Sequence, residues 1–362
     1  MHILIITPGF PKDEKETDCI PPMQEFFEEM MDNHNNIKVS VIAIHYPERK
    51  INYEWKRLRV YAIGGKRRSQ PIRSIYWLAA IWKAININSR NKIDIVHSFW
   101  LNESALIGQI ISRLLGIRHI NTIMGQDAKQ NNKYLKLLPL RRITKAAVSE
   151  FQAGVFKQSA NCDVDAVIPW GIKSFAVKDC ERDIDIIGVG SLIEIKNFDA
   201  FIDVVRELKN EFLRIKCVIL GEGYLRNRLM HKINSYNLQD NISLLGQVPR
   251  EEVLSYMNRS KILLHTSDYE SFGYVLEEAL AAGCYVVSRE VGCANESDKF
   301  FTAESNDDFA KMAGNVLCRD KEYSPRILFP VRETVRSYVD LYEKFLCKDA
   351  KTQNYKVVVN NS

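Results

Sequence analysis

Short apolar runs alternate with longer amphipathic segments along almost the whole chain, and this alternation limits the fold most strongly. In the front half we expect strands at HILIIT, VSVIAIHY, IDIVHSF and HINTIM. PPMQEFFEEMMDN, SIYWLAAIWKAININ and SALIGQIISRLLG have helical spacing of apolar residues, and ITKAAVSEFQAGVFK is expected to be one continuous helix over 143–157. Strands that alternate with helices predict parallel βαβ units with both faces of the sheet covered.

The same alternation restarts after IPWGIKSFAVKDCERD, where the periodicity fails. The sequence therefore predicts an α/β chain with two facing Rossmann-like, doubly wound domains, 1–172 and 173–329. A last helix is expected over 330–348, and the tail 349–362 is expected to be loosely ordered.

The totals place the chain in a broad class. Its 362 residues, 46% of them apolar, suffice for two cores. No apolar run reaches the roughly 18 residues needed to cross a bilayer, and HILIITPGF is too short for a signal-peptide core. Eight cysteines are scattered without a Cys-x-x-Cys pair, which favours neither a zinc site nor a disulfide framework. We therefore expect a cytoplasmic protein.

Positive charge is concentrated in the front half. Residues 1–172 hold 24 Lys and Arg against 16 Asp and Glu, whereas 173–362 hold 26 against 29. This asymmetry indicates either an anionic partner, such as a membrane surface or a phosphate-bearing acceptor, or a merely basic surface.

The stretch KILLHTSDYESFGYVLEEALAAG predicts a strand, a polar turn and a helix. The first turn of such a helix attracts an anion, typically a phosphate, and Gly273 lets the ligand approach the backbone. Glu270 before the helix and Glu278 within it can each accept hydrogen bonds from neighbouring hydroxyls. A phosphate site with a polyol on either side fits a sugar nucleotide; the alternative is an exposed helix with ordinary glutamates.

Glycine-containing turns follow several predicted strands. In IIGVGSLIEIKNFDAF, Lys196 stands at a helix start after such a turn, where it is either a diphosphate ligand or a solvated lysine. Gly221 and Gly223 in LGEG form a weaker signal, since a plain strand-to-helix turn also fits. Gly9 lies in the matching turn after the first strand.

Two polar residues follow strands in the front half. His97 ends IDIVHSF, and Asp127 follows the strand HINTIM. Both are expected to face the opening between the domains, although a single histidine is often structural. His265 also ends a strand, next to Glu270, and is a weaker candidate for direct chemistry.

Together these residues resemble the family 4 glycosyltransferases of the GT-B fold over nearly the whole chain. The hallmark of that family is Glu, seven residues and Glu, here Glu270-SFGYVLE-Glu278 followed by ALAAGCYVV. VGSLIEIKN is similar to the strand and turn that end in the family's lysine, which corresponds to Lys196. LGEG, NISLLGQV, DIVHSF, MGQDA and VIPWGI resemble further landmarks.

The resemblance implies that the second domain binds a nucleotide sugar. Lys196 would hold the diphosphate, Glu270 the sugar hydroxyls, Glu278 the ribose, and Val248 the base through its backbone. The implied donor-binding residues are Gly9, Ser191, Lys196, Gly221, Gly223, Val248, Glu270, Ser271, Phe272, Gly273, Tyr274, Val275 and Glu278. Lys196, Glu270 and His97 are the implied catalytic residues, and His97 and Asp127 would face the acceptor. The last helix would cross back onto the first domain.

The implied reaction moves a sugar from a nucleoside diphosphate, with UDP favoured, to a hydroxyl of a glycan or lipid-linked acceptor, with retained configuration. Cell-surface polysaccharide synthesis is the expected setting, with no cofactor, no metal and no nucleic-acid partner. The Asp-x-Asp sequences at 163–165 and 183–185 lie away from the Glu270 turn and are attributed to chance.

The chain departs from the family pattern at several positions. Ser191 stands where the family often has Arg, Met124 where a His is frequent, and His265 and Tyr285 where a Pro is common. One alternative is therefore a non-catalytic glycosyltransferase-like subunit that activates a partner. Another enzyme on this fold, such as an epimerase or phosphorylase, also fits, whereas an oxidoreductase lacks its Gly-x-Gly-x-x-Gly after the first strand.

Membrane contact is a separate hypothesis. Lys66, Arg67, Arg68 and Arg73 precede an apolar, Trp-containing helix, and KYLKLLPLRRITK is a second basic and apolar segment. Both fit peripheral docking on an anionic inner membrane face. The alternative is that the Trp-containing helix packs into the core.

Overall fold

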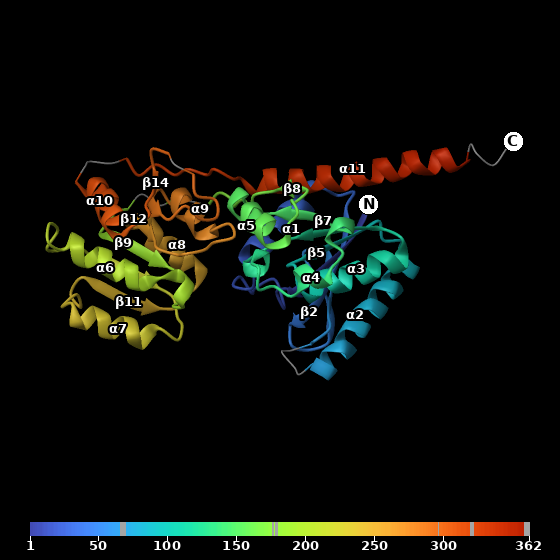
Figure 1. Ribbon diagram of the computed structural model, residues 1–362, viewed down its shortest axis with the longest axis horizontal. Coiled ribbons are helices and arrows are strands. Elements are labelled where there is room, and N and C mark those ends of the chain that lie inside the picture. The colour runs from blue at the N-terminus through green and yellow to red at the C-terminus, as the bar shows by residue number, and fades with distance from the viewer. Residues whose placement is uncertain (66–69, 176, 178–179, 296, 319–321, 358–362) are drawn as a thin grey trace. The chain divides into compact units, whose positions relative to one another are not determined.

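The chain folds into two compact units in the computed structural model, which describes residues 1–65, 70–175, 177, 180–295, 297–318 and 322–357 (Figure 1). Unit 1 comprises Met1–Trp170 together with Val331–Ser362, and unit 2 comprises Gly171–Pro330. Each unit is built around its own sheet and is described separately. No helix among the described residues is long and apolar enough to span a bilayer.

Unit 1 contains an eight-stranded sheet in the order β3-β4-β2-β1-β5-β6-β7-β8. Only β3 runs antiparallel to its neighbour, so the sheet is otherwise parallel. Its inner strands are buried on both faces, as expected where helices cover both sides. The strands are β1 (His2–Gly9), β2 (Lys38–Tyr46), β3 (Ile51–Trp55), β4 (Leu58–Ala62), β5 (Ile95–Phe99), β6 (Arg118–Thr122), β7 (Thr144–Ala147) and β8 (Ala166–Val167).

The helices of unit 1 form two layers. On one face, apolar residues of α2 and α3 pack on β1, β2 and β5 in a single cluster. The other face carries an aromatic cluster to which α1 and α11 contribute. The helices are α1 (Pro21–Asn33), α2 (Gln70–Arg90), α3 (Glu103–Leu115), α4 (Tyr134–Leu137), α5 (Glu150–Ala160) and α11 (Val331–Val357), with short 3-10 turns at Gln126–Ala128 and Leu140–Arg142.

Helix α11 returns to unit 1 after the whole of unit 2 has been built. Its Tyr338 ring packs against Phe26 of α1, with ring centroids 5.3 Å apart, and its hydroxyl lies 2.8 Å from Thr122 Oγ1. Thr334 donates a hydrogen bond to the carbonyl of Pro169 at 2.7 Å. These buried contacts make α11 part of the core of unit 1.

Unit 2 contains a six-stranded, fully parallel sheet in the order β11-β10-β9-β12-β13-β14. The chain first builds outward from β9 to β11 and then returns to place β12 on the other side of β9. This reversal creates a topological switch point between β9 and β12. The strands are β9 (Ile184–Val189), β10 (Cys217–Leu220), β11 (Ile242–Gly246), β12 (Ser260–His265), β13 (Tyr285–Ser288) and β14 (Phe300–Thr302).

The helices of unit 2 cover this sheet. Phe201, Ile202 and Val205 of α6 pack into a core cluster with residues of β9, β10 and β12, and Phe309 of α10 joins the same cluster. The helices are α6 (Phe198–Leu208), α7 (Arg226–Ser235), α8 (Arg250–Asn258), α9 (Tyr274–Ala281) and α10 (Asn306–Leu317), with a 3-10 turn, η3, at Glu194–Lys196. The predicted fold class, two doubly wound α/β domains, is confirmed.

One local expectation was wrong, and two features were not predicted. The segment 143–157 is not one helix, because Thr144–Ala147 pairs with strands on both sides and Ser149 then caps α5 through its side chain. The antiparallel pair β3–β4 was not predicted, since its five-residue strands carry few apolar residues in a row. Helix α11 continues to Val357, beyond the end at residue 348 that was expected for the last helix.

Candidate active site

The candidate site lies at the carboxyl ends of β9 and β12, the two neighbouring strands at the switch point of unit 2. Lys196 ends η3, which follows β9, and Glu270 lies in the turn that follows β12. Open α/β sheets bind ligands at this place because the loops diverge there and leave a crevice. Residues 74 positions apart in the sequence are thereby brought together.

One carboxylate oxygen of Glu270 contacts two other side chains. Lys196 Nζ forms an ion pair with Glu270 Oε1, and His265 Nε2 donates a hydrogen bond to the same oxygen at 3.0 Å. Burial alone would raise the pKa of Glu270, but the His265 hydrogen bond and the Lys196 charge outweigh burial and lower the pKa to about 2. None of the described residues donates to Glu270 Oε2, so this oxygen remains an available acceptor.

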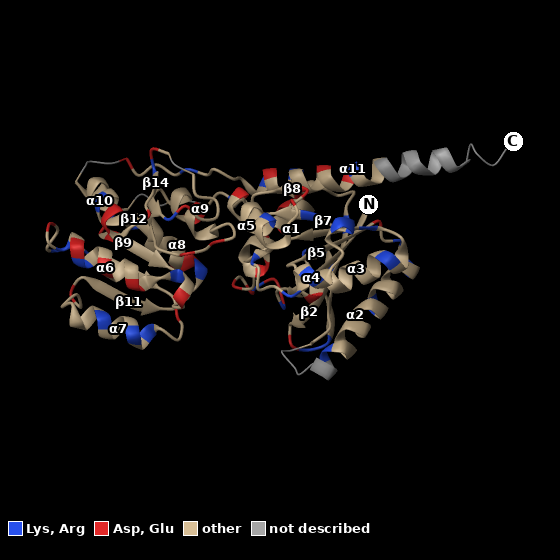
Figure 2. Ribbon diagram, viewed as in Figure 1, with Lys and Arg blue, Asp and Glu red and all other residues tan. Residues whose placement is uncertain are grey.

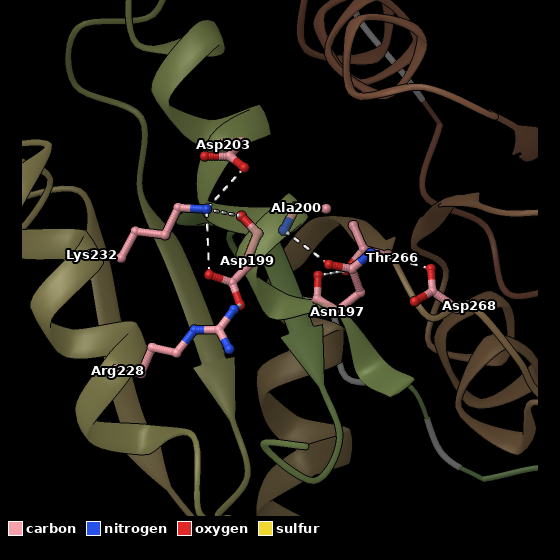
Figure 3. A network of polar contacts seen from close by, with 8 residues as sticks. All are labelled: Asn197, Asp199, Ala200, Asp203, Arg228, Lys232, Thr266 and Asp268. Atoms are coloured by element: carbon pink, nitrogen blue, oxygen red, sulfur yellow. Dashed lines mark hydrogen bonds and ion pairs between the residues drawn. The ribbon is translucent and has the colours of Figure 1, made fainter. Parts of the chain in front are cut away.

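The loop that carries Lys196 is tied to the loop that precedes Glu270 (Figure 3). Thr266 Oγ1 donates to the carbonyl of Asn197 at 2.9 Å, and Asn197 Nδ2 donates to Asp268 Oδ1 at 3.1 Å. The Asp268 N–H donates in turn to the carbonyl of Ile195 at 2.9 Å. These bonds fix the distance between Lys196 and the Glu270 turn without using either side chain.

The following helix is anchored by charges. Asn197 adopts a left-handed conformation, with φ 48°, and its side chain caps α6. Asp199 accepts from Arg228 at 2.6 Å, and Lys232 donates to Asp203 at 2.9 Å (Figure 3). This network links α6 to α7, so the helix that starts after Lys196 has a fixed orientation.

The turn around Phe272 is braced from behind. The Phe272 carbonyl accepts a hydrogen bond from the Cys293 N–H at 2.6 Å, and Gly273 begins α9 in a left-handed conformation, with φ 81°. A side chain at Gly292 would lie 2.3 Å from the Phe272 carbonyl oxygen, so this close approach requires glycine. The predicted donor residues Ser271, Tyr274 and Val275 lie in this turn and the first turn of α9, and they are half-buried.

Glu278 faces a cation that the sequence did not reveal. Arg250 of α8 approaches Glu278 Oε1 with Nε at 2.9 Å and Nη2 at 2.8 Å. Glu278 is largely buried, so this ion pair is more than a surface contact. Val248 lies in the loop between β11 and α8, two residues before Arg250.

Gly221 and Gly223 allow the loop after β10 to contact the loop after β9. A side chain at Gly221 would lie 1.9 Å from the carbonyl oxygen of Gly190, and one at Gly223 would lie 2.3 Å from that of Leu192. Backbone hydrogen bonds join the loops directly, with Leu192 N–H donating to Glu222 at 2.9 Å. The glycines therefore shape the floor beside Ser191, which is exposed.

Glu277, next to Glu278, was not singled out in the sequence. Its Oε2 accepts from the N–H groups of Leu328 and Phe329 at 3.2 and 3.4 Å. Its buried Oε1 has no hydrogen-bond partner among the described residues. Burial raises the pKa of Glu277 to about 7. This acid links the site helix α9 to the segment that leads out of unit 2.

The structure contradicts the predicted role of His97. The ring is completely buried in unit 1, where Nδ1 lies 2.7 Å from the hydroxyl of Tyr342 and Nε2 lies 2.8 Å from Thr122 Oγ1. Burial lowers its pKa to about 3, so the ring is neutral at pH 7. Because α11 covers this strand end, His97 is a core histidine and not an acceptor-facing base.

The other unit 1 candidates have local partners. Asp127 accepts from the N–H groups of Leu101 and Gly125, both at 2.6 Å, and so organises its own turn. Burial nevertheless raises its pKa. Gly9 ends β1, where an added side chain would lie 3.2 Å from Tyr46 Cβ. The proposed contacts of Asp127 with an acceptor and of Gly9 with a diphosphate stay predictions.

The two Asp-x-Asp sequences are engaged in ion pairs. Asp183 accepts from Arg259, and Asp185 accepts from Lys261 at 2.8 Å. Asp165 pairs with Lys145 at 2.6 Å. Among the described residues, no group of three or more His, Cys, Asp or Glu is arranged to hold a metal ion.

His265 and Arg250 are the site residues that sequence reasoning undervalued or missed. His265 carried a signal, because it ends β12 five residues before Glu270. Arg250 carried none, since its partner Glu278 lies 28 residues away on another helix.

Two family models match the chain. The model described as glycosyl transferase 4-like matches residues 26–153, in unit 1. The model described as glycosyl transferases group 1 matches residues 173–299, in unit 2, and this range contains Lys196, Glu270 and Glu278.

Named relatives match parts of the chain. The gpi3 subunit of phosphatidylinositol N-acetylglucosaminyltransferase from Schizosaccharomyces pombe is 36% identical over 107 residues, 30% of this chain and 24% of that protein. A human protein named as part of the same transferase is 25% identical over 70% of this chain and 56% of its own length. An uncharacterized glycosyltransferase of Methanocaldococcus jannaschii is 25% identical over 68% of this chain and 70% of its own. The chain thus matches 24% of the length of the fission yeast protein and 56% of the length of the human protein.

Solved structures share the fold. Sucrose-phosphate synthase from Thermosynechococcus elongatus matches with a TM-score of 0.72 at 13% identity, covering 99% of this chain and 100% of that one. Anabaena HepE, solved in complex with UDP and glucose, matches with a TM-score of 0.63 at 13% identity, covering 98% and 100%. The family models span more than two thirds of the chain between them, and with the shared fold they show that this chain belongs to the glycosyltransferases of the GT-B fold.

Proposed function

We propose that this glycosyltransferase moves a sugar from a nucleoside-diphosphate sugar to an acceptor hydroxyl with retained anomeric configuration. The observation that carries the proposal is the Lys196–Glu270–His265 group at the switch point of unit 2. It combines a cation for a diphosphate with an ionised carboxylate whose Oε2 is available to a hydroxyl. Retention follows from the resemblance to family 4 enzymes.

Each site residue has a separate task in this proposal. Lys196 stabilises the negative charge that develops on the departing diphosphate, which is where electrostatic catalysis acts. Glu270 orients the donor sugar through its hydroxyls, and His265 positions Glu270. Glu278, held by Arg250, binds the ribose, while the loop at Val248 contacts the base. Alignment of donor and acceptor supplies the rest of the rate.

The donor is proposed to be a UDP-sugar, and the acceptor a glycan or lipid-linked hydroxyl in cell-surface polysaccharide synthesis. Anabaena HepE has been solved with UDP-glucose, and the relatives from fission yeast and human are named for transfer to phosphatidylinositol. We also propose that transfer needs no metal ion, which predicts full activity in EDTA. The Asp-x-Asp carboxylates support this because they neutralise Lys and Arg side chains.

A thermal-shift screen with UDP, GDP, ADP and their common sugars tests the donor site. A ligand at 100 times its Kd adds about 2.7 kcal/mol of stability, which is readily measured. We expect a shift with UDP that is lost in Glu278→Ala and kept in Glu207→Ala, a control at an exposed position on α6. No shift with any nucleotide would contradict the proposal and favour a non-catalytic subunit.

Ser191 offers a second test, because the family often has Arg there. An added charged contact to the diphosphate is worth about 1.5–3 kcal/mol. Ser191→Arg should therefore tighten binding of the nucleoside diphosphate about tenfold or more. It should leave binding of the free nucleoside unchanged, and equal tightening of both would refute the assignment of this loop to the diphosphate.

A further inference from the structure

Helix α2 of unit 1 presents an apolar stripe to solvent. Ile75, Leu78, Trp82 and Ile85 are 63%, 66%, 63% and 44% exposed. Their spacing of three, four and three residues places them along one side of the helix. Four large apolar side chains in one row differ from single exposed residues, which are common on any protein surface.

The opposite side of α2 is firmly packed, so the stripe does not belong to a loosely attached helix. Ala80, Ala84 and Ile87 are buried in the core cluster beneath α2. Trp77 Nε1 and Arg73 Nη2 donate to the two oxygens of Glu103 on α3, each at 2.6 Å. The alternative that α2 packs into the core is therefore correct for the side that carries Ala80, Ala84 and Ile87, and not for the side that carries the stripe.

Helix α2 carries basic residues and no acidic ones. Its ribbon accordingly shows no red in Figure 2. On the flank of α2 between the stripe and the buried side, α2 and the first residues of β2 and β4 enclose a pocket of about 250 Å³ whose lining includes Lys38, Arg59, Lys83 and Arg90 and no acid. None of these four cations forms an ion pair with a described residue.

The surroundings of Lys83 indicate that the positive charge of the pocket is not neutralised. Its ammonium lies over the ring of Tyr61, 4.9 Å from the centroid. Burial lowers the pKa of Lys83, and the positive charges of Lys50 and Arg90 lower it further. An anion placed in this pocket would remove that repulsion. Tyr61, which also lines the pocket, supplies a hydroxyl group that can donate to a phosphate oxygen.

We infer that this face of unit 1 docks on an anionic phospholipid bilayer. The stripe enters the boundary between headgroups and acyl chains, and the pocket cations bind lipid phosphates. A second copy of the chain is a poorer occupant, because a symmetric contact through this patch would bring two unneutralised cationic pockets together. The inference does not depend on the donor site, which lies in unit 2.

The structure also revises the basic cluster expected from the sequence. Arg73 is committed to Glu103, and Lys66, Arg67 and Arg68 lie outside the described residues. In the second basic and apolar segment, Leu137 is exposed but Leu138 and Leu140 are buried. The pocket cations, which were not singled out in the sequence, therefore replace that cluster in the proposed surface.

Vesicle flotation of the full chain tests the inference. We expect the wild type to float with vesicles that contain phosphatidylglycerol and not with pure phosphatidylcholine. Leu78→Glu/Trp82→Glu should abolish flotation, and Arg59→Gln/Arg90→Gln should weaken it at least tenfold. Leu213→Glu, a control at a residue 73% exposed in unit 2, should float like the wild type.

Three further readouts separate the alternatives. All variants should keep the melting temperature of the wild type, which excludes misfolding. Soluble glycerol phosphate at 10-fold excess over lipid should not release the protein, since it lacks acyl chains. Wild type that binds no anionic vesicle, a glutamate variant that still floats, or a dimer in sedimentation that the glutamate variant dissociates would each overturn the inference.

Discussion

Glu270 is held in its ionised form by two residues that reach it from different loops. His265 comes from the end of β12, and Lys196 comes from the turn after β9. A carboxylate that accepts both contacts on one oxygen can present its second oxygen to a hydroxyl in a fixed direction. At the scale of single residues, these two contacts orient Glu270 so that it can accept a hydrogen bond from a sugar hydroxyl.

His265 should act through Glu270 and not through direct contact with the donor. Removing the His265 hydrogen bond raises the pKa of Glu270 from about 2 toward its ordinary value of 4.5, so Glu270 protonates at higher pH. In His265→Leu, the acidic limb of the pH–kcat/KM profile should therefore move to higher pH, and His265→Gln should restore it in part. An unchanged acidic limb in His265→Leu would contradict this positioning role.

Among the elements of unit 2, the loops after β9 and β10 depend on backbone contact. Gly221→Ala would place a methyl group against the Gly190 carbonyl, so both loops must move. We expect a loss of about 1–3 kcal/mol in the free energy of unfolding, together with weaker UDP binding.

Gly154→Ala is the matched control for that substitution. Gly154 lies on an exposed side of α5, and an added Cβ would meet no atom within 4 Å. This variant should be unchanged or more stable by about 0.5–1 kcal/mol in chemical denaturation. If both glycine variants behaved alike, close loop packing would not be the reason for glycine at 221.

The contact between α9 and the segment at 328–329 should depend on pH through Glu277. The folded state raises the pKa of Glu277 from 4.5 to about 7, so folding disfavours its ionised form. The resulting cost is absent below pH 4.5, grows between the two pKa values and is complete above pH 7. At about 1.4 kcal/mol per pKa unit, it reaches about 3–4 kcal/mol.

Glu277→Gln removes the titrating group and keeps an acceptor for Leu328 and Phe329. The melting temperature of this variant should exceed that of the wild type more at pH 8 than at pH 5. The same difference at both pH values would show that Glu277 does not titrate as described.

For the whole molecule, the alternation of strands and helices was enough to predict two doubly wound units, because long periodic segments bury predictable faces. The structure also brings Lys196 and Glu270 together, as their positions in the segments after two predicted strands suggested. These features depend on local sequence order, which a single chain displays.

Features that depend on distant partners could not be predicted. His97 has the position of a site residue in the sequence, but Tyr342, 245 positions later, covers it. The role of Arg250 could not be predicted, because it depends on an ion pair with Glu278, which lies on another helix. The strand Thr144–Ala147 is hidden within a helical pattern because four residues are too few for a period to be recognised.

The most direct test of the central claim is the rate at which nucleoside diphosphate is released from a UDP-sugar in the presence of a lipid extract as acceptor source. We predict that Lys196→Met lowers kcat/KM for the donor by about 10²–10³-fold, because the charge on the departing diphosphate loses its stabilising cation. Lys261→Met, which removes a lysine paired with Asp185 near the start of β12, should turn over like the wild type. Wild-type turnover by Lys196→Met would contradict the claim that the switch point of unit 2 is the active site.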